Sequence, residues 1–285
     1  MNKVTIMPSY KRCQYCDKIL FQYYPTEDTY YFYCEHCKNI TRWDFNTIFE
    51  RSQIGYTKIE KLIYLYINKN SVQDAFLFLS SNYIDETLTK KTIRKYFSVI
   101  HDFIFSYYQD SLCSSILDGS IELDETQLFK AKKSHAKHRP CSLEDVWLFG
   151  MIERKSRIFV VIPVENRTEN NLHPLILKHV KVGSILYSDS FSSYINNVVF
   201  PKVSKLETYG YIHYCINHKQ EFCSSAFSHI HTNNIENLWK ILKESIYRMR
   251  MTSNYNFAVA RFYFHQTLTQ EEQLKYIVEK LYENS

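Results

Sequence analysis

The stretch Ser120–Phe129, which reads SIELDETQLF, decides the fold of this chain. Successive side chains of a strand point to opposite faces, so the pattern places Glu122 and Asp124 on one face. Glu125 lies on the other face with the apolar side chain of Leu123. Adjacent carboxylates repel one another unless a cation lies among them. The stretch is therefore either an edge strand with a solvated acidic face or a strand that helps to bind a metal ion.

Further strands and a short helix follow this stretch. Residues 146–167 read as two strands around the turn ERKS, and residues 173–180 as a short helix. An apolar strand in residues 184–194 ends at Asp189, and residues 211–219 form a further strand. An aspartate at the end of a strand often only begins a turn. The alternation of these elements predicts a mixed α/β fold.

An amphipathic helix is predicted at HTNNIENLWKILKESI, residues 231–246. One apolar stripe follows its period and must pack on a sheet: Ile235, Leu238, Trp239, Leu242 and Ile246. Glu236 lies on the adjoining flank, three residues after Asn233, which is the spacing of a capping box. From this pattern alone, Glu236 fits a helix cap and a metal ligand equally well.

Four of the eight cysteines form two C-x2-C pairs separated by 17 residues, namely Cys13, Cys16, Cys34 and Cys37. Two such pairs place four thiolates at the corners of a tetrahedron, which suits a structural zinc ion. Strand-like runs between the pairs predict a zinc ribbon. A second zinc site could be sought in His213, Cys215, His218 and Cys223. Their spacing matches no common ligand pattern, so a strand with supporting polar groups is the better interpretation.

Basic residues gather in two places. Residues 54–108 read as helices, with a break before a helix whose first turns carry Lys90, Lys91, Arg94 and Lys95. This arrangement is typical of a helix-turn-helix, and equally of a helix with a solvated charged face. The densest positive charge lies directly after the acidic strand, in Lys130, Lys132, Lys133, Lys137 and Arg139. This concentration of positive charge favours a polyanionic partner.

Composition narrows the class of protein. The chain has 285 residues, a net charge of +5 and few glycines and prolines, as expected for a globular protein. No run approaches the roughly 18 apolar residues of a membrane span, and no signal peptide is evident. We therefore expect an intracellular, soluble protein with a polyanionic partner and no membrane partner.

The segments LDET, WLFGMIERKSR, YSDSFSSY, INHKQEF and HTNNIENLWKILK together resemble the Merlin-type group of DDE transposases and its bacterial insertion-sequence relatives. The similarity extends from about Ile121 to Tyr263. It implies an RNase H-like core with a mixed sheet flanked by helices, preceded by a zinc ribbon and a helical segment.

The resemblance also implies a catalytic site. Matched position by position, its three acids are Asp124, Asp189 and Glu236, with Asn233 or Asn234 as rivals for the third role. These acids would hold two Mg2+ or Mn2+ ions, with Asp124 bridging them. Lys243, or alternatively Lys240, would contact a DNA phosphate.

The resemblance further implies domains and partners. Expected are a zinc ribbon in residues 1–48, a helical DNA-binding segment in 49–117, the catalytic domain in 118–270 and a C-terminal helix in 271–285. The expected function is metal-dependent cleavage and strand transfer at an element's terminal inverted repeats, by a homodimer or larger assembly on double-stranded DNA. A domesticated, non-catalytic DNA-binding protein is the alternative. The compartment would be the nucleus in a eukaryotic host and the cytoplasm in a bacterial one.

Overall fold

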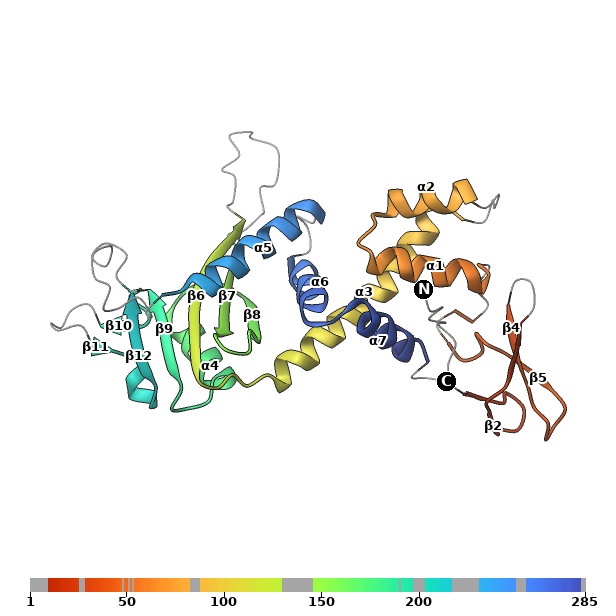
Figure 1. The fold of residues 1–285 in the computed structure, drawn as a ribbon, viewed down its shortest axis with the longest axis horizontal. Helices are drawn as coiled ribbons and strands as arrows, with labels where there is room; N and C mark the ends of the chain where they lie inside the picture. The colour runs from red at the N-terminus through yellow and green to blue at the C-terminus, as the bar shows by residue number, and fades with distance from the viewer. Residues whose placement is uncertain are drawn as a thin grey trace. The chain divides into compact units, whose positions relative to one another are not determined.

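The computed structural model describes residues 10–25, 29–47, 49–50, 52, 54–82, 88–129, 146–189, 191–196, 203–216, 231–249 and 255–282 (Figure 1). The chain divides into two compact units. The first unit combines Met1–Tyr108 with Ala260–Ser285, and the second unit is Gln109–Val259. Within the described residues, no helix has both the length and the apolar character needed to span a bilayer.

Short antiparallel strands form the start of the first unit. Strands β1 (Lys11–Arg12) and β2 (Ile19–Leu20) pair with each other, and β3 (Tyr23–Pro25), β4 (Tyr30–Tyr33) and β5 (Ile40–Arg42) form a three-stranded sheet. Both pieces are too small to bury a core by themselves. The four cysteines lie in the turns that follow β1 and β4.

The first unit also contains the helices α1 (Tyr56–Ile67), α2 (Val72–Asn82) and α7 (Gln270–Tyr282). Helices α3 (Lys90–Ser114) and α6 (Tyr255–Thr267) belong to it only in part, because the unit boundaries after Tyr108 and before Ala260 fall within them. The predicted basic helix therefore begins at Lys90. The hydroxyl of Thr89 caps it by accepting a hydrogen bond from the Thr92 amide at 3.1 Å. Among its basic residues, Lys91, Arg94 and Lys95 are exposed, and the Lys90 ammonium lies 5.4 Å from the centre of the Phe76 ring. Contact of these residues with DNA stays a prediction.

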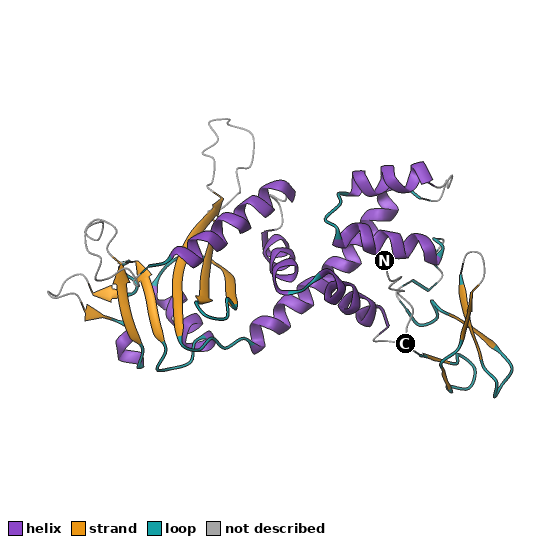
Figure 2. Cartoon of the chain, in the orientation of Figure 1, coloured by secondary structure: helices purple, strands orange, loops and turns teal. Residues whose placement is uncertain are grey.

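The second unit contains a five-stranded mixed sheet, drawn as orange arrows in Figure 2. Its strands follow the order β12-β9-β6-β7-β8, as labelled in Figure 1. Its strands are β6 (Ser120–Phe129), β7 (Val146–Glu153), β8 (Phe159–Val164), β9 (Ile185–Asp189) and β12 (Ile212–Ile216). Strand β7 is antiparallel to both β6 and β8, whereas β9 runs parallel to both β6 and β12. The stretch SIELDETQLF is thus the central strand. The edge-strand interpretation is wrong, because β7 and β9 pair with both of its edges.

Helices cover both faces of this sheet. On one face, Leu172 and Ile176 of α4 (Glu169–His179) share a buried apolar cluster with Ile121 and Leu123 of β6. On the other face lies α5 (Asn233–Met249), whose predicted apolar stripe is buried throughout. Smaller elements, β10 (Ile195–Asn196), β11 (Val203–Ser204) and the 3-10 helix η1 (Leu206–Tyr209), accompany the α4 face. The mixed sheet with flanking helices confirms the RNase H-like fold class.

Candidate active site

A buried carboxylate on β6 holds the start of α5. Glu122 is fully buried, and its Oε2 accepts the backbone N–H groups of Asn234 at 2.9 Å and Ile235 at 3.1 Å. Its Oε1 accepts the Asn234 side-chain amide at 2.8 Å and the guanidinium Nε of Arg154 at 2.8 Å. The Arg154 guanidinium lies over the Tyr187 ring, 3.6 Å from its centre, and donates to the His231 carbonyl oxygen. We call these contacts of Glu122 the Glu122 clasp.

The helix start differs in detail from the predicted capping box. The helix begins at Asn233, and the Glu236 amide donates to the Thr232 carbonyl oxygen at 3.1 Å. The Glu236 carboxylate accepts a hydrogen bond from the Thr232 hydroxyl at 2.8 Å. The amides that a capping residue of the same helix would bind are instead bound by Glu122. Spacing within one segment does not reveal a cap that comes from another strand.

Asp124 lies two residues beyond Glu122, on the same face of β6. Its Oδ2 accepts a hydrogen bond from the indole Nε1 of Trp239 at 2.9 Å. Burial raises the pKa of Asp124 to about 6, and repulsion from Asp189 and Glu236 adds to this, against the lowering effect of the Trp239 hydrogen bond. The three predicted acids therefore interact electrostatically.

Asp189 reaches this region through strand register. Residue 120 of β6 pairs with residue 185 of β9, and residue 122 with residue 187. Continued by two positions, this parallel register brings Asp189 level with Asp124 on the neighbouring strand. Asp189 also begins a turn, since its Oδ1 accepts the Phe191 amide at 3.1 Å. Both interpretations of this aspartate are therefore compatible.

The acids do not form a tight cluster in this structure. Among the described residues, the four cysteines alone form a set of three or more ligand groups within 4.8 Å of one another. Asp124 and Asp189 are partly buried, whereas Glu236 is exposed at the first turn of α5. Of the two rivals for the third role, Asn234 directs its amide nitrogen to Glu122 and Asn233 is exposed.

Lysines of α5 differ in their relation to the acids. Burial lowers the pKa of Lys243, and the negative charge of Asp124 opposes this effect. Lys243 is thus within electrostatic reach of Asp124. Lys240 is exposed.

Glu125 lies on the face of β6 that the strand alternation predicts, but the sequence pattern does not reveal its partners there. It points to the α4 face, where the Tyr194 hydroxyl donates a hydrogen bond to it. Burial raises the pKa of Glu125 to about 8, with further contributions from Asp124 and Asp189, while Arg167 acts in the opposite direction. At neutral pH this side chain is mostly protonated. The apolar alternation of β6 predicts its inward direction, and burial beside two other acids explains the retained proton.

The Arg167 guanidinium provides a positive charge beside Glu125. It lies between two aromatic rings, 3.9 Å from the centre of Trp147 and 4.5 Å from the centre of Phe191. Such stacking holds an arginine in place without neutralising it. Nothing in the spacing of these three residues along the chain indicates that they meet.

The second zinc site has no support among the described residues. Both ring nitrogens of His213 are hydrogen-bonded, to Ser188 at 2.8 Å and to Ser204 at 2.7 Å. Burial lowers the pKa of His213 to about 4, so the ring is neutral. Cys215 lies 3.7 Å from the ring, while His218 and Cys223 lie outside the described residues. His213 of β12 therefore acts as a supporting polar group that links Ser188 of β9 to Ser204 of β11.

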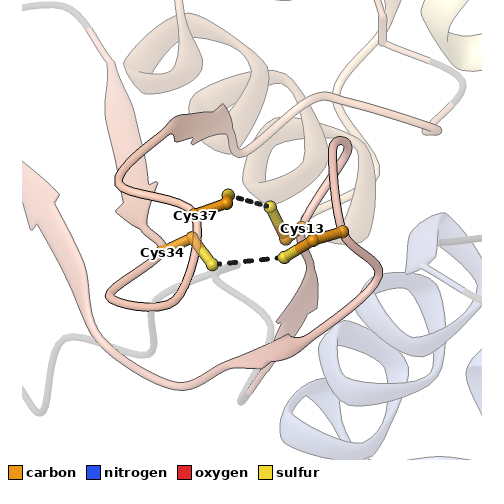
Figure 3. Close-up of side chains that lie close together, drawn as sticks. Cys13, Cys34 and Cys37 are labelled. Atoms are coloured by element: carbon orange, nitrogen blue, oxygen red, sulfur yellow. Dashed lines mark hydrogen bonds between the residues drawn. The ribbon is translucent and has the colours of Figure 1, made fainter.

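The four amino-terminal cysteines converge as predicted (Figure 3). The Sγ atoms of Cys13 and Cys37 are 3.5 Å apart, as are those of Cys16 and Cys34. This agrees with the roughly 3.8 Å between sulfurs in a tetrahedral site with zinc–sulfur bonds of about 2.3 Å. Backbone N–H groups, chiefly that of Cys37, lower the pKa of Cys34 and favour its thiolate.

The two cysteine turns share one backbone conformation. In each turn, the residue after the second cysteine donates its backbone N–H to the carbonyl oxygen of the first cysteine. Asp17 donates to Cys13 at 3.0 Å, and Lys38 donates to Cys34 at 2.8 Å. Asp17 and Lys38 both adopt the left-handed conformation, with φ of 58° and 59°. This cluster has the donor set of a structural metal site.

The predicted basic loop is the segment of residues 130–139. Lys130, Lys132, Lys133, Lys137 and Arg139 all lie outside the described residues. Their role beside the acidic strand stays a prediction.

The pKa of Glu125 predicts a pH dependence of stability. Folding raises this pKa from 4.5 to about 8, so the stabilising contribution is complete below pH 4.5 and is lost as the pH rises through 8. In magnesium-free buffer, the free energy of unfolding of the second unit should fall by about 2 kcal/mol between pH 6.5 and 8. Glu125→Gln should flatten this slope, as measured by urea unfolding. Glu165→Gln, an exposed change in the same unit, is the matched control, and equal slopes in both variants would contradict the assignment.

The family comparison agrees with this fold. The family model of the ISXO2-like transposase domain matches residues 116–258, about half of the chain, and these residues include all three predicted acids. No curated protein matches the sequence.

Among solved structures, the chain is similar to a chain in the cryoEM structure of the simian T-cell lymphotropic virus intasome in complex with PP2A regulatory subunit B56 gamma. The identity is 14% and the TM-score is 0.31, which is too low for any conclusion about function. The match covers 57% of this chain and 48% of that chain. The family match carries the assignment: this chain belongs to the ISXO2-like transposase family.

Proposed function

We propose that this chain is a DNA transposase that cleaves and joins DNA strands with Asp124, Asp189 and Glu236 as its metal-binding acids. One observation carries the proposal: in a chain of a transposase family, β6, β9 and α5 bring these three acids into electrostatic interaction around Asp124. Three carboxylates that repel one another do not stabilise the folded state, because bringing like charges together costs free energy. Their presence together is therefore best explained by a cation.

The donor set suits Mg2+, which prefers hard oxygen ligands. Asp124 is partly buried, and its carboxylate is oriented by the hydrogen bond that Oδ2 accepts from Trp239. Asp189 and Glu236 would complete the set. Bound Mg2+ would stabilise the negative charge that develops on the entering and leaving oxygens of a phosphodiester. The same oxygens also accept Mn2+.

The chain's own residues would hold and orient the DNA. In cleavage, a water oxygen attacks phosphorus as the bond to a sugar oxygen breaks, and in strand transfer a sugar hydroxyl replaces the water. Lys243, within reach of Asp124, would bind a phosphate next to the reacting one. Glu125 keeps its proton at neutral pH and so adds no further negative charge beside the DNA. The basic residues of α3 and of residues 130–139 would bind the DNA backbone farther from the site.

Substitution of each acid tests the proposal. With DNA carrying the element's own ends and Mg2+, Asp124→Asn, Asp189→Asn and Glu236→Gln should each lower the rate of strand cleavage by more than about 100-fold, because each loses a charged ligand. Glu165→Gln should keep the wild-type rate. Asn233→Ala tests the rival for the third role and should also cleave normally.

Three results would count against the proposal. Full activity of any acid variant removes that residue from the site. Loss of activity in Asn233→Ala, with activity kept in Glu236→Gln, transfers the third role to the asparagine. A wild-type protein that binds the ends tightly but never cuts them indicates the non-catalytic DNA-binding protein instead.

We propose further that the cysteine cluster holds one structural zinc ion. The convergence of Cys13, Cys16, Cys34 and Cys37, with no space for a substrate among four thiolates, supports a structural role over a catalytic one.

Metal analysis tests this zinc site. Purified protein should contain about one zinc per chain, and Cys34→Ser should lose it and unfold the cysteine turns. Cys113→Ser, a change at an exposed free cysteine, should retain the zinc. A wild-type protein without zinc, or a Cys34→Ser variant that keeps it, would show that the cluster has another role.

A further inference from the structure

The Trp239 side chain packs on Gly150 and donates a hydrogen bond to Asp124. In the pairing of β6 with β7, Gly150 lies directly opposite Asp124. The Trp239 ring lies over this glycine and its Nε1 donates to Asp124 Oδ2 at 2.9 Å. The ring is 95% buried, since only 5% of the residue is exposed. One side chain of α5 therefore contacts both strands at the position of the acid.

Gly150 is the residue that permits this approach. A Cβ atom at this position would lie 2.5 Å from two carbons of the Trp239 ring and 2.9 Å from the Cδ1 atom of Ile235. Real Cβ atoms do not approach other atoms within 3.0 Å, and an indole ring cannot fold out of the way as a flexible chain can. Any larger residue would push α5 away from the strand and its indole N–H away from Asp124.

We propose that Trp239, seated on Gly150, is a positioning residue that orients the Asp124 carboxylate for metal binding. This inference rests on the proposed function and adds a residue to it. An indole N–H can only donate, so it binds the carboxylate and never competes for the metal. Its hydrogen bond to Oδ2 limits the rotation of the carboxylate. Outer-shell donors of this kind commonly set the affinity of a metal ligand.

A purely structural role for Trp239 makes a different prediction. Trp239 belongs to the apolar stripe of α5, whose other members have aliphatic side chains without a hydrogen-bond donor. If the ring only filled space, phenylalanine would preserve the metal affinity of the site at a small cost in stability. If the indole N–H positions Asp124, phenylalanine keeps the ring over Gly150 and still weakens metal binding.

Mn2+ binding separates the two roles. In zinc-loaded protein, with Asp124→Asn as the baseline, Trp239→Phe should bind Mn2+ on the order of tenfold more weakly than wild type, by calorimetry and electron paramagnetic resonance. Gly150→Ala, which keeps the N–H but displaces the ring, should weaken binding similarly. Trp43→Phe, the same change at a buried tryptophan of the first unit, should leave Mn2+ affinity unchanged.

The native protein supplies a readout that needs no substitution in the site. The chain has three tryptophans, so 15N labelling gives three indole resonances. Titration with Mg2+ should shift the Trp239 indole resonance and leave that of Trp43 in place. This readout decides the question if Trp239→Phe or Gly150→Ala fails to fold.

Each outcome has one meaning. Weaker Mn2+ binding in a folded Trp239→Phe, or a Mg2+-dependent shift of its indole resonance in wild type, supports the positioning role. Wild-type affinity in a folded Trp239→Phe, or an unmoved Trp239 resonance while Mg2+ binds, overturns the positioning role and leaves the proposed function intact. A wild-type protein that binds neither ion at Asp124 overturns both.

Discussion

The Glu122 clasp is the contact on which the candidate site depends. A helix begins with N–H groups that lack partners within the helix, and a negative charge near them is stabilised by the helix dipole. From the central strand, Glu122 accepts the Asn234 and Ile235 amides and places its negative charge at the start of α5. Its buried charge is balanced by Arg154, whose Nε lies 2.8 Å from Glu122 Oε1. A buried carboxylate without such partners would cost several kcal/mol. The position of Glu236, two residues after Asn234, follows from this attachment.

The same strand divides its acids between different tasks. Glu122 accepts hydrogen bonds from two backbone amides, a side-chain amide and a guanidinium and is structural, whereas Asp124 accepts the Trp239 indole N–H and is held near two other acids. Glu125 points to the opposite face and keeps a proton because burial outweighs the opposing effect of Arg167. Three acids within four residues thus have three environments. Repulsion among these acids destabilises the fold, and burial of the apolar cluster between β6 and α4 offsets this cost.

Local patterns predicted the elements of the fold, and long-range contacts decided the details. The alternation of SIELDETQLF, the cysteine spacing and the apolar stripe of α5 are periodicities within one segment, so the sequence reveals them directly. The central place of β6 and the clasp depend on which segments pack together. Glu122 and Asn234 are 112 residues apart, and no pattern in either segment indicates that the two residues are in contact. For the same reason, the apolar stripe predicts that Trp239 is a core residue but does not reveal that its N–H reaches Asp124. The capping-box spacing likewise points to Asn233, although Glu122 binds the first amides of the helix.

Amide hydrogen exchange at the start of α5 tests the clasp most directly. The Asn234 and Ile235 amides belong to the first turn, where helical N–H groups normally exchange rapidly because they lack a partner. Since Glu122 accepts both and is fully buried, these two amides should exchange as slowly as those in the middle of α5, and Glu122→Ala should abolish this protection. Exchange of both amides at the rate of an unstructured peptide in the folded wild-type protein would contradict the account.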